Sequence, residues 1–143
     1  MTRIKIELPA VLPFTTLIPV RITDLNYGGH VGNDTVLSLI HEARMRFLHQ
    51  YGYTELNFGG IGIIMSDVAI EFKIELFYGD ELKASVALTE ISKVSFAFYY
   101  KLEKETGKGQ VAVAIARTGM VCYNYEAKKI APVPEKIKQQ FTP

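Results

Sequence analysis

Residues 24–34, DLNYGGHVGND, place two aspartates, two asparagines, a histidine and three glycines directly before an apolar helical pattern. Carboxylate, amide and imidazole side chains can accept, donate or transfer protons, and glycine lets the backbone approach a ligand closely. A helix that starts beside such a loop also directs its first free N–H groups toward it. The stretch is therefore a candidate site, although the same residue types also serve as helix caps and turn residues.

The helix predicted after this loop runs between Val36 and Tyr51, where apolar residues recur with helical spacing and leave only a narrow polar face. Such a helix should be largely buried. We expect Asn33 or Asp34 to cap its N-terminus, and Gly52 to end its last turn in a left-handed conformation.

One strand is predicted before the loop and four after the helix. The run that starts near Phe14 is β-branched and apolar, and Pro19 indicates an edge strand or a bulge. After Ile61 the apolar period changes to two, which predicts one buried strand face formed by Val68, Ile70, Phe72, Ile74 and Leu76. The later runs are joined by turns short enough for antiparallel hairpins: Gly79-Asp80, Ser92-Lys93 and residues 106–109.

These elements predict an α+β architecture. A helix too apolar to lie on a surface, followed by a meander of long strands, is best buried if the sheet curls around it. We therefore expect a hot-dog fold, a curved antiparallel sheet around one long central helix, in a single domain over residues 1–143. Such a domain leaves an edge strand open, which predicts a homodimer or homotetramer.

The composition excludes several classes of protein. The chain is 48% hydrophobic and 22% charged, as in ordinary soluble domains, and its 16 basic and 15 acidic residues create no field that attracts nucleic acid. Its N-terminus lacks the apolar stretch of a signal peptide or membrane span, so we expect a cytoplasmic protein without membrane contact. The single cysteine, Cys122, fits a buried core residue, and we expect no metal site.

Three segments carry a resemblance to a known family. VRITDLNYGGHVGN, followed by HEAR, resembles the family's V-R-x-x-D-x-D-x-x-G-H-V-N-N loop and its E-x-A-R helix motif. FYGDEL is similar to the turn between its second and third strands, and MVCYNYEAKKIAPVPEKI to the end of its last strand and the tail. From about Phe14 to Pro134 the chain thus resembles the 4-hydroxybenzoyl-CoA thioesterase-like branch of the hot-dog superfamily, the small acyl-CoA thioesterases.

The resemblance implies a hydrolase that cleaves an acyl-CoA or acyl-carrier thioester to free acid and thiol at a subunit interface. Coenzyme A is then part of the substrate, and no cofactor is expected. Hydrolysis needs a place for the developing oxyanion and a base close to the carbonyl carbon. Backbone N–H groups near His30, Val31 and Gly32 are the natural carbonyl-polarising site. The candidate substrate-binding residues are Gly28, Gly29, Val31, Gly32 and Asn33.

Position 26 departs from the family pattern. The second acid of the family's D-x-D is the catalytic one, whereas this chain reads Asp24-Leu25-Asn26. An amide can hydrogen-bond a carbonyl or hold a water, but it cannot take up a proton near neutral pH. Either the base has moved, or the protein binds acyl thioesters or acyl carriers without hydrolysing them quickly. A hot-dog dehydratase or hydratase is less well supported, because its expected histidine and helix acid lack their family context.

Four residues are therefore candidates for catalysis. The first choice is His30 acting on a water held by Asn26, followed by Glu42 on the central helix and then Asp24. Structural roles stay open for two of these candidates, Glu42 and Asp24. Glu42 can form an ion pair or a dimer contact together with Arg44, and Asp24 can fix the loop through backbone hydrogen bonds.

Overall fold

The computed structural model describes residues 2–143, which form one antiparallel sheet curved around a long helix. In chain order the elements are β1 (Phe14–Pro19), the 3-10 helix η1 (Ile22–Asp24), α1 (Asn33–Gln50), β2 (Gly62–Phe72), β3 (Glu81–Thr89), β4 (Ser95–Thr106), β5 (Gly109–Asn124), β6 (Lys129–Ile130) and α2 (Glu135–Phe141). The predicted order of one strand, a helix and four strands is confirmed. The sequence pattern does not predict η1, β6 or α2.

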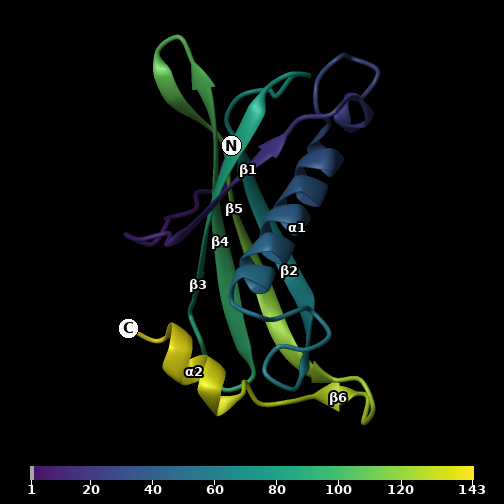
Figure 1. Ribbon diagram of the computed structural model, residues 1–143, viewed down its shortest axis with the longest axis vertical. Coiled ribbons are helices and arrows are strands. Elements are labelled where there is room, and N and C mark those ends of the chain that lie inside the picture. Colours follow the sequence, from purple (N-terminus) through teal and green to yellow (C-terminus); the bar gives the residue numbers. More distant parts are fainter. Residues whose placement is uncertain (1) are drawn as a thin grey trace.

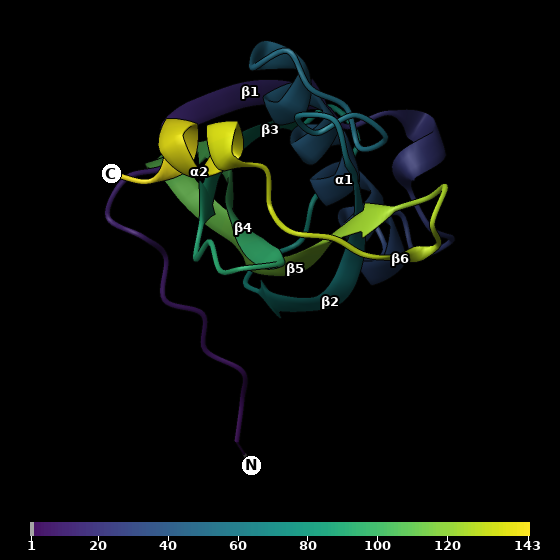
Figure 2. The same cartoon turned by 90° about the horizontal axis from the view of Figure 1, so that it is seen from below.

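The sheet has the strand order β1-β3-β4-β5-β2, with β6 paired to the end of β5. Every strand pair is antiparallel. The strands form an arc with α1 on its inside and with β1 and β2 at its two ends (Figure 1, Figure 2). This arrangement confirms the predicted α+β hot-dog fold.

The concave face of the sheet and the apolar face of α1 form the core. The buried residues of α1 are Val36, Leu39, Ile40, Ala43, Arg44, Phe47 and Leu48. Phe47 packs edge-on against Phe98 of β4, with ring centroids 5.4 Å apart. Ala114 and Ala116 of β5 are also fully buried, and their small side chains leave room for close packing. Burial thus fixes α1 along most of its length.

The start of α1 differs from the prediction. Gly32 is the N-cap residue, because its backbone is extended and its carbonyl accepts the first helical bond, from Val36 N–H at 3.0 Å. The expected caps, Asn33 and Asp34, are instead the first two helical residues, and no side chain in residues 2–143 caps the helix. Glycine is itself a common N-cap residue, and the prediction is wrong because it favours the polar side chains that follow Gly32. Gly52 has φ 82°, as predicted.

The predicted buried face of β2 is largely wrong. Val68, Phe72 and Ile74 are 39%, 40% and 41% exposed, and the strand already ends at Phe72; Leu76 is buried, as expected. β2 is the last strand of the sheet, and α1 lies against the opposite edge, formed by β1 and β3. The concave side of β2 is therefore left uncovered.

A charged network beside α1 joins the buried guanidinium of Arg44 to the partly exposed side chains of Glu55 and His41. Arg44 is only 5% exposed; its Nε donates to Glu55 at 3.0 Å and its Nη1 to the Tyr100 hydroxyl at 3.2 Å. His41 Nε2 lies 2.8 Å from the other carboxylate oxygen of Glu55. Burial raises the pKa of Glu55, but the hydrogen bonds from His41 and Arg44 outweigh this effect, so the pKa lies below its usual value.

Replacing Glu55 should destabilise the fold, because the buried Arg44 charge loses its partner. We expect Glu55→Gln to lower the free energy of unfolding, measured by urea denaturation, by about 1–3 kcal/mol. Glu42→Gln is the control. Glu42 pairs with Arg46 at 2.8 Å rather than with Arg44, and it is half exposed, so its replacement should cost less than about 0.5 kcal/mol.

The stability difference between wild type and Glu55→Gln should also depend on pH. Because the pKa of Glu55 is lower in the folded protein than in the unfolded chain, its contribution is present above the usual carboxylate range and is lost as the pH falls through the folded pKa. The difference should therefore narrow below about pH 4. A difference that stays constant into acid would contradict the assignment.

Candidate active site at the start of the central helix

Residues 26–30 form a closed turn between η1 and α1. Asn26 N–H donates to the His30 carbonyl at 2.8 Å, and Asn26 Oδ1 accepts from Gly28 N–H at 2.8 Å. Gly29 has φ 85°, a conformation that favours glycine. A methyl group on Gly28 would lie 3.2 Å from Asn26 Oδ1 and 3.6 Å from His30 Nε2. The turn therefore brings the Asn26 and His30 side chains together, and Gly28 leaves the space between them.

The imidazole of His30 is held in one orientation. Its Nδ1 lies 3.1 Å from the Val31 carbonyl oxygen, which can only accept, so we assign the proton of the neutral ring to Nδ1. Nε2 then carries the lone pair. This atom lies 3.9 Å from Oε1 of Glu75.

A cavity of about 190 Å³ lies at the start of α1. It is lined by His30 and Val31 of the loop, Asn33 and Val36 of α1, Val113 of β5, and residues 72–76, where the chain leaves β2. Three of the predicted site residues, His30, Val31 and Asn33, thus meet at one cavity. Asn26, Gly28 and Gly29 lie exposed in the adjacent turn.

The backbone N–H groups beside this cavity are only partly available. Val31 N–H donates to the Leu76 carbonyl at 2.9 Å, so the prediction that this N–H polarises a carbonyl is wrong. The first N–H groups of α1, beginning with Asn33, have no intrahelical acceptor, and the N-cap Gly32 contributes no side-chain cap. These N–H groups can therefore donate to an anionic oxygen, which the positive end of the helix dipole also favours.

Gly32 keeps the start of the helix open. A methyl group at this position would lie 2.6 Å from Asp34 Oδ1 and 3.6 Å from Asn26 Nδ2. Any larger residue would displace the Asp34 carboxylate. Gly32 therefore leaves the helix start accessible beside two polar side chains.

Asp24 lies in a different place. It is buried at the end of η1, where it accepts from Arg21 N–H at 2.8 Å and pairs with the Arg21 guanidinium at 3.2 Å. Burial raises the pKa of Asp24, but the bonds and charge of Arg21 outweigh this effect and hold the pKa below its usual value. Asp24 thus fixes the loop, as the structural alternative proposed.

Glu42 shares a second cavity with Asp24 rather than the cavity of His30. This cavity, of about 470 Å³, lies between β1 and α1. Arg46, which pairs with Glu42, also donates to the Leu17 carbonyl of β1 at 2.7 Å. The structure therefore separates the four catalytic candidates into two groups, Asn26 with His30 and Asp24 with Glu42.

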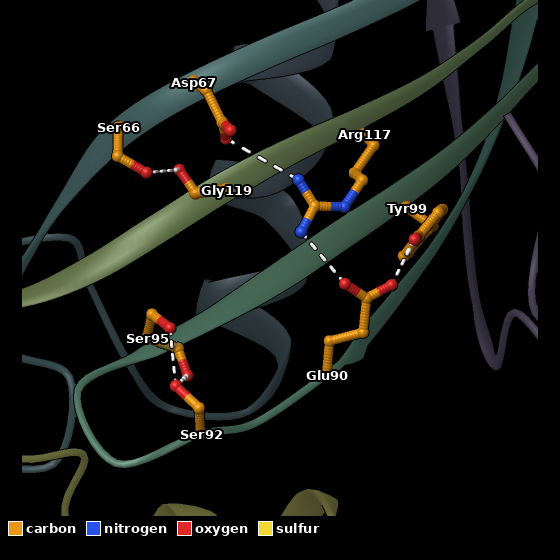
Figure 3. A network of polar contacts seen from close by, with 8 residues as sticks. All are labelled: Ser66, Asp67, Glu90, Ser92, Ser95, Tyr99, Arg117 and Gly119. Atoms are coloured by element: carbon orange, nitrogen blue, oxygen red, sulfur yellow. Dashed lines mark hydrogen bonds and ion pairs between the residues drawn. The ribbon is translucent and has the colours of Figure 1, made fainter. Parts of the chain in front are cut away.

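Another polar network lies on the face of the sheet turned away from α1 (Figure 3). Arg117 of β5 pairs with Glu90 at 2.9 Å and with Asp67 of β2 at 3.6 Å, and the Tyr99 hydroxyl donates to Glu90. These charges compensate one another across three strands. They border neither of the two cavities described above.

Other kinds of chemistry receive little support. Cys122 is fully buried, as predicted, and burial raises its pKa to about 11, which disfavours the nucleophilic thiolate. Within residues 2–143, no three His, Cys, Asp or Glu side chains gather as metal ligands. In the same part of the chain, none of the helices has the length and apolar character needed to cross a membrane.

Glu75 is the site residue that sequence reasoning missed. The alternation in residues 68–76 assigns Glu71 and Glu75 the same role on the wet face of a strand. Because β2 ends at Phe72, the chain turns toward the loop, and Glu75 alone of these two glutamates lines the cavity of His30. The hydrophobic periodicity of the sequence does not distinguish Glu75 from Glu71.

Comparisons with known proteins show the family to which the chain belongs. The family model of the thioesterase-like superfamily matches residues 20–141. A 1,4-dihydroxy-2-naphthoyl-CoA hydrolase of Microcystis aeruginosa is 29% identical over 130 residues, which cover 89% of this chain and 90% of that protein.

Two solved structures show the same fold. The 1,4-dihydroxy-2-naphthoyl-CoA thioesterase of Synechocystis has a TM-score of 0.78 at 24% identity, covering 90% of this chain and 94% of that one. The second is a 4-hydroxybenzoyl CoA thioesterase mutant with asparagine in place of an aspartate, complexed with 4-hydroxybenzoyl CoA. It has a TM-score of 0.80 at 18% identity, covering 90% of this chain and 98% of that one. With the hot-dog sheet and the family match over residues 20–141, the chain belongs to the thioesterase-like superfamily and is a thioester hydrolase.

Proposed function

We propose that the protein hydrolyses an acyl-CoA thioester to free acid and thiol in the cavity at the start of α1. The observation that carries this proposal is that His30, a side chain able to accept a proton, and Asn33, the first residue of an uncapped helix, line the same cavity. A proton acceptor and oxyanion donors are thus available on two sides of one space. The hydrolysis needs no cofactor, because coenzyme A is part of the substrate.

In this mechanism the thioester carbonyl oxygen lies against the first N–H groups of α1. His30 Nε2 takes a proton from the attacking water as its oxygen bonds to the carbonyl carbon, and the negative charge moves to the carbonyl oxygen. The C–S bond then breaks, and the same proton passes to the sulfur. Asn26 Nδ2, beside Gly32, donates to the carbonyl or holds the water.

The acyl group is proposed to be aromatic. The relatives described above are named for 1,4-dihydroxy-2-naphthoyl-CoA and 4-hydroxybenzoyl CoA, both of which are hydroxylated aromatic thioesters. Val36 and Phe72 give the cavity apolar walls that suit a ring.

A second candidate is a protein that binds acyl-CoA or acyl-carrier thioesters without rapid hydrolysis. The specific observation in its favour is Asn26, an amide at the position where the family pattern carries an acid. The 4-hydroxybenzoyl CoA complex was likewise obtained with a mutant in which asparagine replaces an aspartate.

Thiol release from short, long and aromatic acyl-CoAs separates the two candidates. We expect wild type to release thiol, with the highest kcat/KM for aromatic acyl groups, and His30→Ala to lower kcat by about 100-fold to 10,000-fold, because the proton acceptor is lost. Asn26→Asp is the informative companion variant. Saturable acyl-CoA binding without turnover in wild type, with hydrolysis appearing in Asn26→Asp, would establish the second candidate instead.

Gly32→Ala tests the open helix start. The added methyl group would displace Asp34, whereas the extended backbone of Gly32 suits alanine, so we expect kcat/KM to fall about tenfold or more and the free energy of unfolding to change by less than about 1 kcal/mol. Gly107→Ala is the matched control, since a methyl group there meets nothing within 4 Å. Equal activity of the two variants would contradict this role of Gly32.

We also propose that the protein assembles through β2 into a homodimer, or into a homotetramer built from such dimers. β2 is a long edge strand, and on its concave side Met65, Val68 and Phe72 are about two-fifths exposed. An uncovered apolar edge of this kind favours pairing with a second chain. Because Phe72 also lines the cavity, the partner would border the active site.

Val68→Glu should prevent this assembly, because it would bury a charge in the interface. We expect the variant to be monomeric by light scattering coupled to size-exclusion chromatography. The control, Val111→Glu, alters a valine of similar exposure on β5, 36% against 39%, and should leave the assembly intact. A dimeric Val68→Glu protein would exclude the β2 interface.

A further inference from the structure

We propose that Glu75 is a positioning residue for His30, and that the two form a His–Glu pair that supplies the negative charge that Asn26 cannot. This inference rests on the proposed function, in which His30 is the base. It assigns a role to a carboxylate outside the DLNYGGHVGND loop.

The first support is the orientation of the two side chains. His30 Nδ1 is bonded to the Val31 carbonyl, which leaves Nε2 as the atom that accepts a proton. Glu75 Oε1 lies 3.9 Å from that same atom, within ion-pair distance. Both residues line the cavity at the start of α1. The carboxylate therefore faces the nitrogen whose charge changes during the reaction.

The second support is a backbone bond that sets this distance. Val31 N–H donates to the Leu76 carbonyl at 2.9 Å, so the residue after His30 is tied directly to the residue after Glu75. The carbonyl of Glu75 also accepts from Lys104 Nζ of β4 at 2.9 Å. The backbone of Glu75 is thus held both to the loop and to the sheet, and its side chain starts from a fixed point.

The third support is that a competing charge in the cavity lining is paired elsewhere. Lys73 lines the same cavity, and an ammonium beside Glu75 would compete with His30 for its carboxylate. Lys73 Nζ instead pairs with Glu71 Oε2 at 2.5 Å. Glu75 is 61% exposed at its side chain, against 32% for His30, so the carboxylate is the more hydrated of the two side chains.

The pair would act in both halves of the reaction. As the water oxygen bonds to the carbonyl carbon, its proton moves to His30 Nε2, and the Glu75 carboxylate stabilises the imidazolium that forms. As the C–S bond breaks, the same proton moves from Nε2 to the thiolate sulfur. Glu75 keeps its negative charge throughout and exchanges no proton.

The test is a double-mutant cycle with Glu75→Gln and His30→Gln, in which kcat and KM for an aromatic acyl-CoA are measured separately. We expect Glu75→Gln to lower kcat about tenfold with KM changed less than twofold, and to have no further effect in the His30→Gln background. Glu81→Gln is the control, since it removes an exposed carboxylate of β3 that does not line the cavity. It should leave both constants unchanged.

The outcomes separate this inference from the proposed function. If His30→Gln lowers kcat but Glu75→Gln does not, or if Glu75→Gln costs as much in the His30→Gln background as in wild type, the pair is overturned while the hydrolase stands. If wild type releases no thiol, the proposed function fails. The ¹⁵N resonances of the His30 ring then decide the pairing: a shift on Glu75→Gln supports it, and unchanged resonances overturn it.

Discussion

Burial of α1 inside the curved sheet is the constraint on which the rest of the structure depends. Ile40, Ala43 and Leu48 are completely buried, so the helix can neither slide nor rotate without opening the core. A fixed helix has a fixed N-terminus, and its unpaired N–H groups point at one place. The packing of the core therefore holds these N–H groups rigidly, although the loop that precedes them is largely exposed.

The burial of α1 also explains which partners the charged side chains of this helix have. α1 carries Arg44 into the core, and this guanidinium has partners in Glu55 and in the Tyr100 hydroxyl, which also lies 2.7 Å from Thr118 Oγ1. Glu42, on the outer side of the helix, is bound by Arg46. Both acids of this region are thus occupied in holding elements together. Neither carboxylate lines the cavity of His30.

The sequence predicts the individual helices and strands far better than the way they pack against one another. Helical and alternating periods identify α1 and the five main strands, because burial of one face dictates those periods. They do not reveal that α1 lies toward the β1 edge, which is why Val68 and Phe72 are exposed rather than buried. Residue types likewise suggest Asn33 and Asp34 as caps, because the preference for polar caps ignores a neighbouring glycine with suitable backbone angles. The Val31–Leu76 bond joins residues 45 positions apart, and no local pattern encodes it.

The exchange of an acid for an amide at position 26 has a physical consequence for the loop. Asn26 already uses its Oδ1 to bind Gly28 N–H, so it holds the turn closed without placing a charge beside the Asp34 carboxylate. An aspartate there would add a like charge near Asp34, which disfavours ionisation of both groups. The carboxylate near the imidazole is instead that of Glu75, whose Oε1 lies 3.9 Å from His30 Nε2. In this arrangement the carboxylate beside the imidazole comes from the segment after β2 and not from position 26 of the turn.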